Sequence, residues 1–280
     1  MSAPVDWRAW SEEERQAQVS PSSVIGGDYE PYVERYLRES REAVDLLHGT
    51  STLGVVVSDS GYPVDVFLSP TNGGPVLVYI HGGYWQDLDR QYSRFAAPAL
   101  AEIGWGCVVV GYPIAPGASI PMMIDVCASA LRWTKSMLQP STLVVAGSSA
   151  GAHLAACAAA LTDAHVDGLL LFSGVYELEP LIGTSVNDAL ALDAEEASAL
   201  SPIVRKPCVA PTFLSWGEHE TDWFKSISRR YADYLRTYDI DVSESESPGR
   251  NHFDVVHDLQ SGGSPVQQWL RQLGLQCPPR

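Results

Sequence analysis

The chain has 280 residues, 45% of them hydrophobic and 19% charged, which is the composition of an ordinary globular domain with a well-buried core. Its formal net charge is −16, so its surface repels the phosphates of nucleic acids and of anionic membranes. We therefore expect neither a nucleic acid nor a membrane as a partner.

The first part of the chain is predicted to be helical. Residues Asp6–Gln18 read as a short helix, and Glu30–Leu47 as an amphipathic helix whose apolar residues recur at helical spacing. A polar loop separates the two. We expect this N-terminal helical segment, residues 1–48, to pack on a single domain that comprises residues 1–280.

After Gly49 the pattern changes to that of β-structure. Two β-rich runs, Leu53–Val57 and Val64–Leu68, flank a turn sequence and predict a hairpin. Apolar runs typical of strands buried on both faces follow at Pro75–Ile80, Gly106–Val110, Leu143–Ala146, Leu169–Phe172 and Thr212–Trp216. Helical segments are predicted at about Tyr92–Ile103, Met122–Leu138, Ala150–Leu161, Asp222–Tyr238 and Pro265–Leu273.

This alternation predicts an α/β protein with a mostly parallel central sheet and helices on both faces. Catalytic loops of such proteins lie at the carboxyl ends of the strands. The stretch Tyr176–Leu200 fits no strand–helix unit, and we interpret it as a short excursion over the active site.

The sequence Gly147-Ser148-Ser149-Ala150-Gly151 matches the G-x-S-x-G pattern of a nucleophile elbow. An apolar strand precedes it and an alanine-rich helix follows it, which is the context that this turn requires. We therefore predict an α/β-hydrolase fold with Ser149 as the nucleophile. The alternative is a tight turn with a structural role only.

A second glycine motif follows the strand at Pro75–Ile80. It reads His81-Gly82-Gly83-Tyr84-Trp85, and glycines in this place let backbone N–H groups approach a developing oxyanion. We predict that the amides of Gly82, Gly83 and Ala150 form the oxyanion hole.

The base and the acid should follow the nucleophile, because hydrolases of this fold run in the order serine, acid, histidine. Of the late histidines His219, His252 and His257, we predict His252 as the base, because it lies in PGRNHFDVV, which we interpret as a loop between one further strand and the closing helix. Three carboxylates compete for the acid, and we favour Glu220 over Glu218 and Asp222.

The chain resembles the kynurenine formamidase (arylformamidase) family of α/β hydrolases over nearly its whole length. The motifs that carry the resemblance include SEEERQAQVSPSSV, HGGYW, GYPIAP, GSSAGAH, SGVYELEPL, WGEH and NHFD. Where the family usually has EHD, this chain has Glu218-His219-Glu220, so Glu220 aligns with the catalytic aspartate. The family's nucleophile and base correspond to Ser149 and His252.

The resemblance implies hydrolysis of N-formyl-L-kynurenine to L-kynurenine and formate through a formyl-enzyme. It also implies a small-molecule substrate and a homodimer, and no metal or organic cofactor. Five aromatic residues flank the predicted site and are candidates for stacking on an aryl amine. They are Tyr84, Trp85, Tyr112, Tyr176 and Phe253. The alternative for each is core packing.

Other functions fit the same motifs less well. A carboxylesterase acting on small aryl or alkyl esters would use the same triad, and a formamidase of a biosynthetic pathway would act on a substituted kynurenine. A non-catalytic binding protein is disfavoured because Ser149, His252 and the glycine motif are intact.

The five cysteines predict neither a disulfide framework nor a zinc site, because no close pair occurs among Cys107, Cys127, Cys157, Cys208 and Cys277. The N-terminal sequence has no apolar run of the kind that a secretory signal carries. We therefore expect a cytoplasmic protein.

Overall fold

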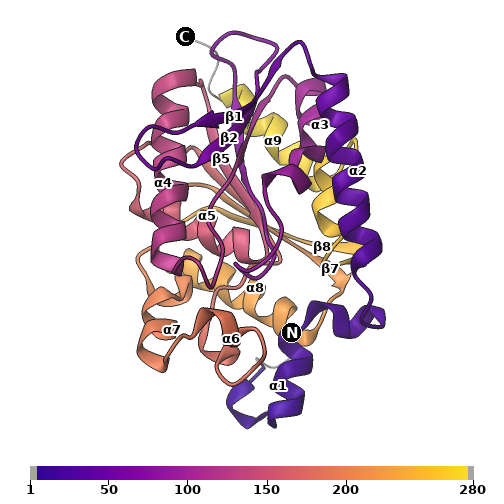
Figure 1. The fold of residues 1–280 in the computed structure, drawn as a ribbon, viewed down its shortest axis with the longest axis vertical. Coiled ribbons are helices and arrows are strands. Elements are labelled where there is room, and N and C mark those ends of the chain that lie inside the picture. The colour runs from indigo at the N-terminus through magenta and orange to yellow at the C-terminus, as the bar shows by residue number, and fades with distance from the viewer. Residues whose placement is uncertain (1–4, 277–280) are drawn as a thin grey trace.

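The computed structural model describes residues 5–276, in which an eight-stranded sheet is covered by helices on both faces (Figure 1). Its strands are β1 (Ser51–Val56), β2 (Pro63–Phe67), β3 (Val76–Ile80), β4 (Gly106–Val110), β5 (Leu143–Ser148), β6 (Gly168–Phe172), β7 (Thr212–His219) and β8 (Val242–Asn251). The strand order is β1-β2-β4-β3-β5-β6-β7-β8. Strand β2 is antiparallel to both of its neighbours, and all other pairs are parallel. The predicted hairpin and mostly parallel sheet are confirmed.

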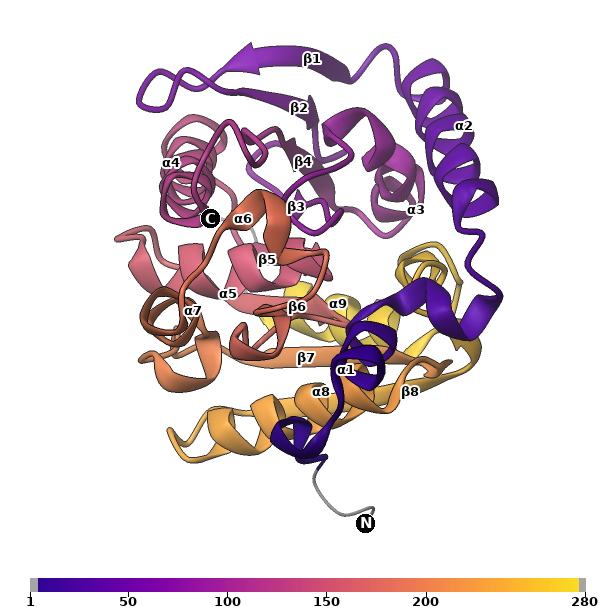
Figure 2. The same cartoon turned by 60° about the horizontal axis from the view of Figure 1, so that its bottom comes forward.

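The helices form a layer on each face of the sheet. The α-helices of the described residues are α1 (Glu12–Val19), α2 (Glu30–Leu46), α3 (Ala97–Glu102), α4 (Ile120–Leu138), α5 (Ala150–Leu161), α6 (Asn187–Leu190), α7 (Ala194–Leu200), α8 (Asp222–Arg236) and α9 (Pro265–Gln276). Short 3₁₀ helices are η1 (Trp7–Ala9), η2 (Pro21–Ile25), η3 (Arg90–Tyr92), η4 (Arg94–Ala96), η5 (Glu179–Leu181), η6 (Pro202–Val204) and η7 (Val255–Leu259). Helices α4, α5 and α8 pack on one face, and α2, α3 and α9 belong to the layer on the other (Figure 2).

Each central strand contributes side chains to both layers, because successive residues of a strand point to opposite faces. In β3, Val78 and Ile80 belong to the core under α4 and α5, whereas Leu77 and Tyr79 belong to the core under α3 and α9. This double burial explains why the central strands are apolar throughout.

The N-terminal helices differ in part from the prediction. The predicted helix Asp6–Gln18 is divided into η1 and α1, because Ser11 has an extended backbone and begins α1 through a capping box with Glu14. The predicted helix Tyr92–Ile103 consists of η3, η4 and the short α3. Helix α2 occupies the predicted residues within one position of its end.

The excursion between β6 and β7 contains η5, α6 and α7, and Figure 1 shows α6 and α7 at the same end of the molecule as α1. Helix α1 contacts η5 and α8, and α2 packs against η4. The N-terminal segment and the excursion therefore meet at the end of the sheet where β5 delivers the predicted nucleophile. Among residues 5–276, no helix is both long enough and apolar enough to cross a membrane.

Candidate active site

Ser149 lies at the sharp turn between β5 and α5, with a φ of 54° and a ψ of −120°. A positive φ is unfavourable for a residue with a β-carbon, so the turn holds Ser149 in a strained conformation. A β-carbon on Gly147 would collide with the backbone of Gly151, and one on Gly151 would collide with the carbonyl groups of Ile80 and His81. The two glycines of the motif are therefore required by close backbone contacts on both sides of the serine.

The loop after β3 lies directly against this turn. A β-carbon on Gly82 would be 2.9 Å from the Ser148 carbonyl oxygen and 3.3 Å from the Ser149 β-carbon. Gly83 has a φ of 98°, and its carbonyl oxygen accepts hydrogen bonds of 2.9 Å from the amides of Gln86 and Asp87. The glycine motif is thus a tight turn whose backbone lies against the predicted nucleophile, Ser149.

The three predicted oxyanion donors are available. Within residues 5–276, the amides of Gly82, Gly83 and Ala150 donate no hydrogen bond to another protein group. Ala150 is the first residue of α5, where the helix dipole favours negative charge. An oxygen that develops negative charge beside Ser149 could accept hydrogen bonds from these amides.

His252 and Glu220 are in direct contact. His252 Nδ1 lies 3.0 Å from Glu220 Oε2, and both side chains are buried. Because the carboxylate can only accept, Nδ1 carries the proton and Nε2 is left as the basic nitrogen. Glu220 Oε1 accepts two further hydrogen bonds, of 2.6 Å from Ser173 Oγ and 2.5 Å from the Gly217 amide. The carboxylate is therefore held by fixed donors at the ends of β6 and β7.

The two competing carboxylates lie elsewhere. The side chain of Glu218 is 52% exposed, and its Oε2 accepts from the Gly249 amide at 2.8 Å. Asp222 is an exposed residue in the first turn of α8. Neither contacts His252, so the geometry leaves Glu220 as the partner of the imidazole.

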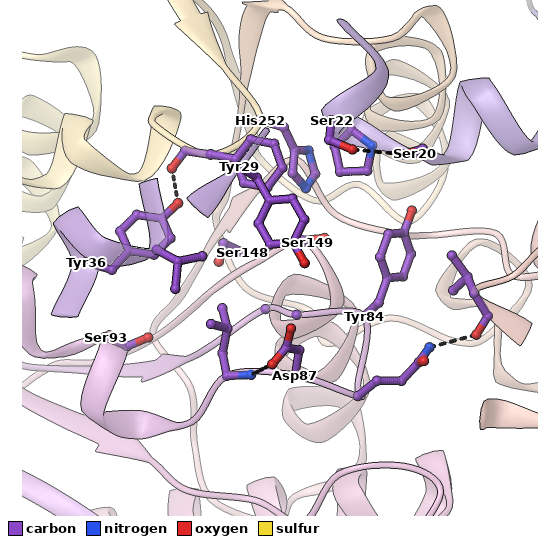
Figure 3. A pocket seen from close by; sticks show the side chains of 18 of the residues that line it. Ser20, Ser22, Tyr29, Tyr36, Tyr84, Asp87, Ser93, Ser148, Ser149 and His252 are labelled. Atoms are coloured by element: carbon purple, nitrogen blue, oxygen red, sulfur yellow. Dashed lines mark hydrogen bonds between the residues drawn. The ribbon is translucent and has the colours of Figure 1, made fainter. Parts of the chain in front are cut away.

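Ser149 and His252 face the same cavity of about 480 Å³ (Figure 3). Within the described part of the chain, no direct hydrogen bond joins them, and catalytic hydrogen bonds in ligand-free sites commonly tighten only when substrate binds. Phe224 packs on the imidazole with a centroid separation of 4.2 Å. The cavity therefore brings together a serine, an imidazole oriented by a carboxylate, and unpaired amides.

Helix α2 clamps the loop that carries His252. The Asn251 Nδ2 group donates to the Tyr32 hydroxyl at 2.8 Å, and the Tyr36 hydroxyl donates to the Phe253 carbonyl. Tyr29 stacks on the Phe253 ring with a centroid separation of 5.8 Å. These tyrosines were not predicted as site residues, because helical periodicity shows only that a helix has an apolar face and not what that face covers.

The five predicted aromatic contacts divide into two groups. Tyr84 and Phe253 line the cavity. Trp85, Tyr112 and Tyr176 do not, and the prediction that they contact substrate is not supported by their positions. They are buried in the core, where Trp85 packs on His153, Tyr112 stacks on His81 and Tyr176 stacks on Tyr231.

His81 is placed to support the glycine turn and not to act as a base. Burial lowers its pKa to about 4, so the ring is neutral at pH 7. Its Nδ1 contacts the Gly82 carbonyl at 2.8 Å, and its ring stacks on Tyr112 at 4.1 Å. These contacts hold the glycine turn in place.

The remaining lining residues come from distant segments. An apolar part of the cavity is lined by Val33, Tyr36, Tyr79, Leu88 and Phe95, and a polar part by Gln16, Ser20, Ser22, Gln86 and Ser185. Figure 3 shows Tyr36 and Tyr84 on opposite sides of Ser149. The motif SEEERQAQVSPSSV contains Gln16, Ser20 and Ser22, but the sequence did not predict that any of these residues lines the cavity. Among residues 5–276, no group of three His, Cys, Asp or Glu side chains is arranged to hold a metal ion.

The chain is similar to known enzymes along nearly its full length. A family model described as the α/β-hydrolase fold matches residues 77–201. A kynurenine formamidase of Salmo salar is 28% identical over 288 aligned positions, which cover 95% of this chain and 98% of that protein. A kynurenine formamidase of Drosophila melanogaster is 29% identical, over 87% of this chain and 89% of that protein.

The fold is also similar to those of solved esterases. Esterase LipW from Mycobacterium marinum superimposes with a TM-score of 0.70 at 19% identity, covering 99% of this chain and 97% of that chain. An identity this low supports a common fold and says nothing about the substrate.

Proposed function

Since the chain belongs to the kynurenine formamidase family of α/β hydrolases, we propose that it hydrolyses N-formyl-L-kynurenine to L-kynurenine and formate. The observation that carries this proposal is the contact between His252 Nδ1 and Glu220 Oε2 beside the strained Ser149. This contact orients Nε2 as a base in the cavity that contains the serine hydroxyl.

In the first half of the reaction, Ser149 Oγ attacks the formyl carbon while His252 Nε2 takes its proton. The carbonyl oxygen becomes an oxyanion that accepts hydrogen bonds from the amides of Gly82, Gly83 and Ala150. Collapse of this intermediate breaks the C–N bond, and the imidazolium gives its proton to the departing aryl amine. In enzymes of this kind, removal of one oxyanion donor typically raises the activation free energy by about 3–4 kcal/mol.

In the second half, water attacks the formyl ester on Ser149 and passes a proton to His252. The ester bond breaks, the imidazolium returns the proton to Ser149 Oγ, and formate leaves. Glu220 keeps its charge throughout and stabilises the imidazolium that forms in each half.

The test compares kcat/KM for N-formyl-L-kynurenine with that for an aryl acetate, in the wild type and in Ser149→Ala. We expect a preference for the formamide, and a loss of about 10⁵ or more in kcat for both substrates in the variant. A preference for the acetate would favour the carboxylesterase alternative. Activity that survives in Ser149→Ala would reject the mechanism.

We further propose a cytoplasmic homodimer. The four cysteines of the described residues, Cys107, Cys127, Cys157 and Cys208, are unpaired thiols, which is the usual state in a reducing compartment. Cys277 lies outside the described residues. Light scattering coupled to gel filtration tests the dimer, which the family resemblance supports; a monomer at micromolar concentration would reject it.

A further inference from the structure

The cavity is lined by one charged side chain beyond the groups of the proposed triad, the carboxylate of Asp87. All lining residues lie in the described part of the chain, and they include neither lysine nor arginine. If a ligand carries both an ammonium and a carboxylate group, the cavity therefore offers an oppositely charged side chain only to the ammonium. For a carboxylate the walls offer neutral donors, the hydroxyls and amides of the polar part.

The position of Asp87 is set by the turn that carries the oxyanion donors. Its amide donates to the Gly83 carbonyl at 2.9 Å, and its own carbonyl packs so closely under Gly83 that no β-carbon would fit there. Within residues 5–276, its carboxylate forms no ion pair and accepts one hydrogen bond, of 2.9 Å from the Leu88 amide to Oδ1. Figure 3 shows the Asp87 carboxylate among the side chains that line the cavity, which Ser149 also lines.

We infer that Asp87 determines substrate specificity by binding an ammonium group on the leaving aryl amine. This inference rests on the proposed function and extends it, because it names the ammonium group as the part of the substrate's amino-acid side chain that the enzyme binds. The net charge of −16 acts in the same direction, since the field of the whole surface attracts cations and repels carboxylates. The preferred substrate class is an aryl formamide that carries an ammonium group and needs no carboxylate.

Three probes separate the two charged groups. The first is N-formyl-L-kynurenine, which has both; the second is its decarboxylated analogue, which keeps the ammonium; the third is its deaminated analogue, which keeps the carboxylate. We expect the decarboxylated analogue to have a kcat/KM at least equal to that of the parent. Because Asp87 is an exposed residue, the deaminated analogue should have a KM about three- to fivefold higher, the effect of one exposed ion pair.

The variant Asp87→Asn keeps the acceptor for the Leu88 amide and removes the charge. It should raise KM about three- to fivefold for the two ammonium-bearing probes and leave their kcat nearly unchanged. The KM of the deaminated probe should fall or stay as it is. Asp89→Asn is the matched control on the same loop. Asp89 Oδ1 accepts from the Gln91 amide at 2.6 Å and Asp89 does not line the cavity, so this variant removes an equal charge without the contact.

The results distinguish the inference from the proposed function. Equal KM changes in both variants, or an equal effect of Asp87→Asn on all three probes, would overturn the role of Asp87 while the formamidase activity stands. If no aryl formamide is hydrolysed and an aryl acetate is, the proposed function fails instead. A KM increase that is confined to Asp87→Asn and to ammonium-bearing probes supports the inference.

Discussion

Replacing Glu220 by glutamine is predicted to move the proton of the His252 imidazole from Nδ1 to Nε2. In the structure, Glu220 Oε1 accepts from both the Ser173 hydroxyl and the Gly217 amide, at 2.6 and 2.5 Å. A glutamine must therefore place its oxygen there, because its NH₂ group would face two donors. The NH₂ group then occupies the position of Oε2, 3.0 Å from His252 Nδ1, and donates to it.

A donor at Nδ1 requires the tautomer with the proton on Nε2, the nitrogen that has to accept the serine proton. The imidazolium also loses the negative charge that stabilises it. An acid-to-amide change of this kind lowers kcat by about 10⁴. That ratio corresponds to about 5.4 kcal/mol in the activation free energy.

The assay is steady-state hydrolysis of N-formyl-L-kynurenine by the wild type, Glu220→Gln and the control Glu218→Gln. Glu218 is 52% exposed and does not contact the imidazole, so its variant should keep kcat within about twofold. Circular dichroism establishes that each variant is folded. A folded Glu220→Gln enzyme with a kcat within tenfold of the wild type would refute the assignment of the acid.

Three further predictions concern the supports of the site. Tyr32→Phe removes the hydrogen-bond partner of the Asn251 side-chain amide. It should lower kcat about three- to tenfold with KM nearly unchanged, because one hydrogen bond of about 1 kcal/mol is lost. An unaltered kcat would contradict the role of α2 in holding the loop that carries His252. Ser149→Gly should abolish turnover but raise the free energy of unfolding by about 1 kcal/mol in a urea titration. The reason is that glycine adopts a φ of 54° without the strain that a β-carbon causes. A variant less stable than the wild type would contradict the conclusion that Ser149 is strained. Burial lowers the pKa of His81 and of His153 from the ordinary 6.5 to about 4. Between pH 6.5 and pH 4 the unfolded chain therefore binds more protons than the folded protein does. As a result, the free energy of unfolding decreases as the pH falls through this range. Urea titrations from pH 7 to pH 4 should show this loss, and it should be smaller in His153→Gln.

Local sequence was sufficient to predict the central sheet and the strand–turn–helix geometry at Ser149. Strand β4 and helix α5 begin and end where their apolar runs and flanking glycines predict. The G-x-S-x-G turn is predictable because its geometry depends on backbone contacts within a few residues of Ser149 and on the strand beside it. The predicted base likewise followed from chain order in this fold.

The aromatic side chains were predicted with less success, for a physical reason. Tyr84 and Trp85 are neighbours in one motif, yet the first lines the cavity and the second is fully buried. Adjacent residues of a tight turn point in different directions, and the composition of the motif does not specify which of them points inward. In the folded protein Trp85 packs edge-to-face on His153 within the core.

Sequence alone determined the fold class and the G-x-S-x-G turn, because hydrophobic periodicity and glycine spacing act over short distances along the chain. The sequence favoured Glu220 among three carboxylates, but only the tertiary structure shows that it contacts His252 and that α2 and the excursion complete the cavity. The hydrogen bond from Asn251 to Tyr32 of α2, for example, joins residues 219 positions apart. The geometry of such contacts depends on the packing of whole elements rather than on the local sequence pattern.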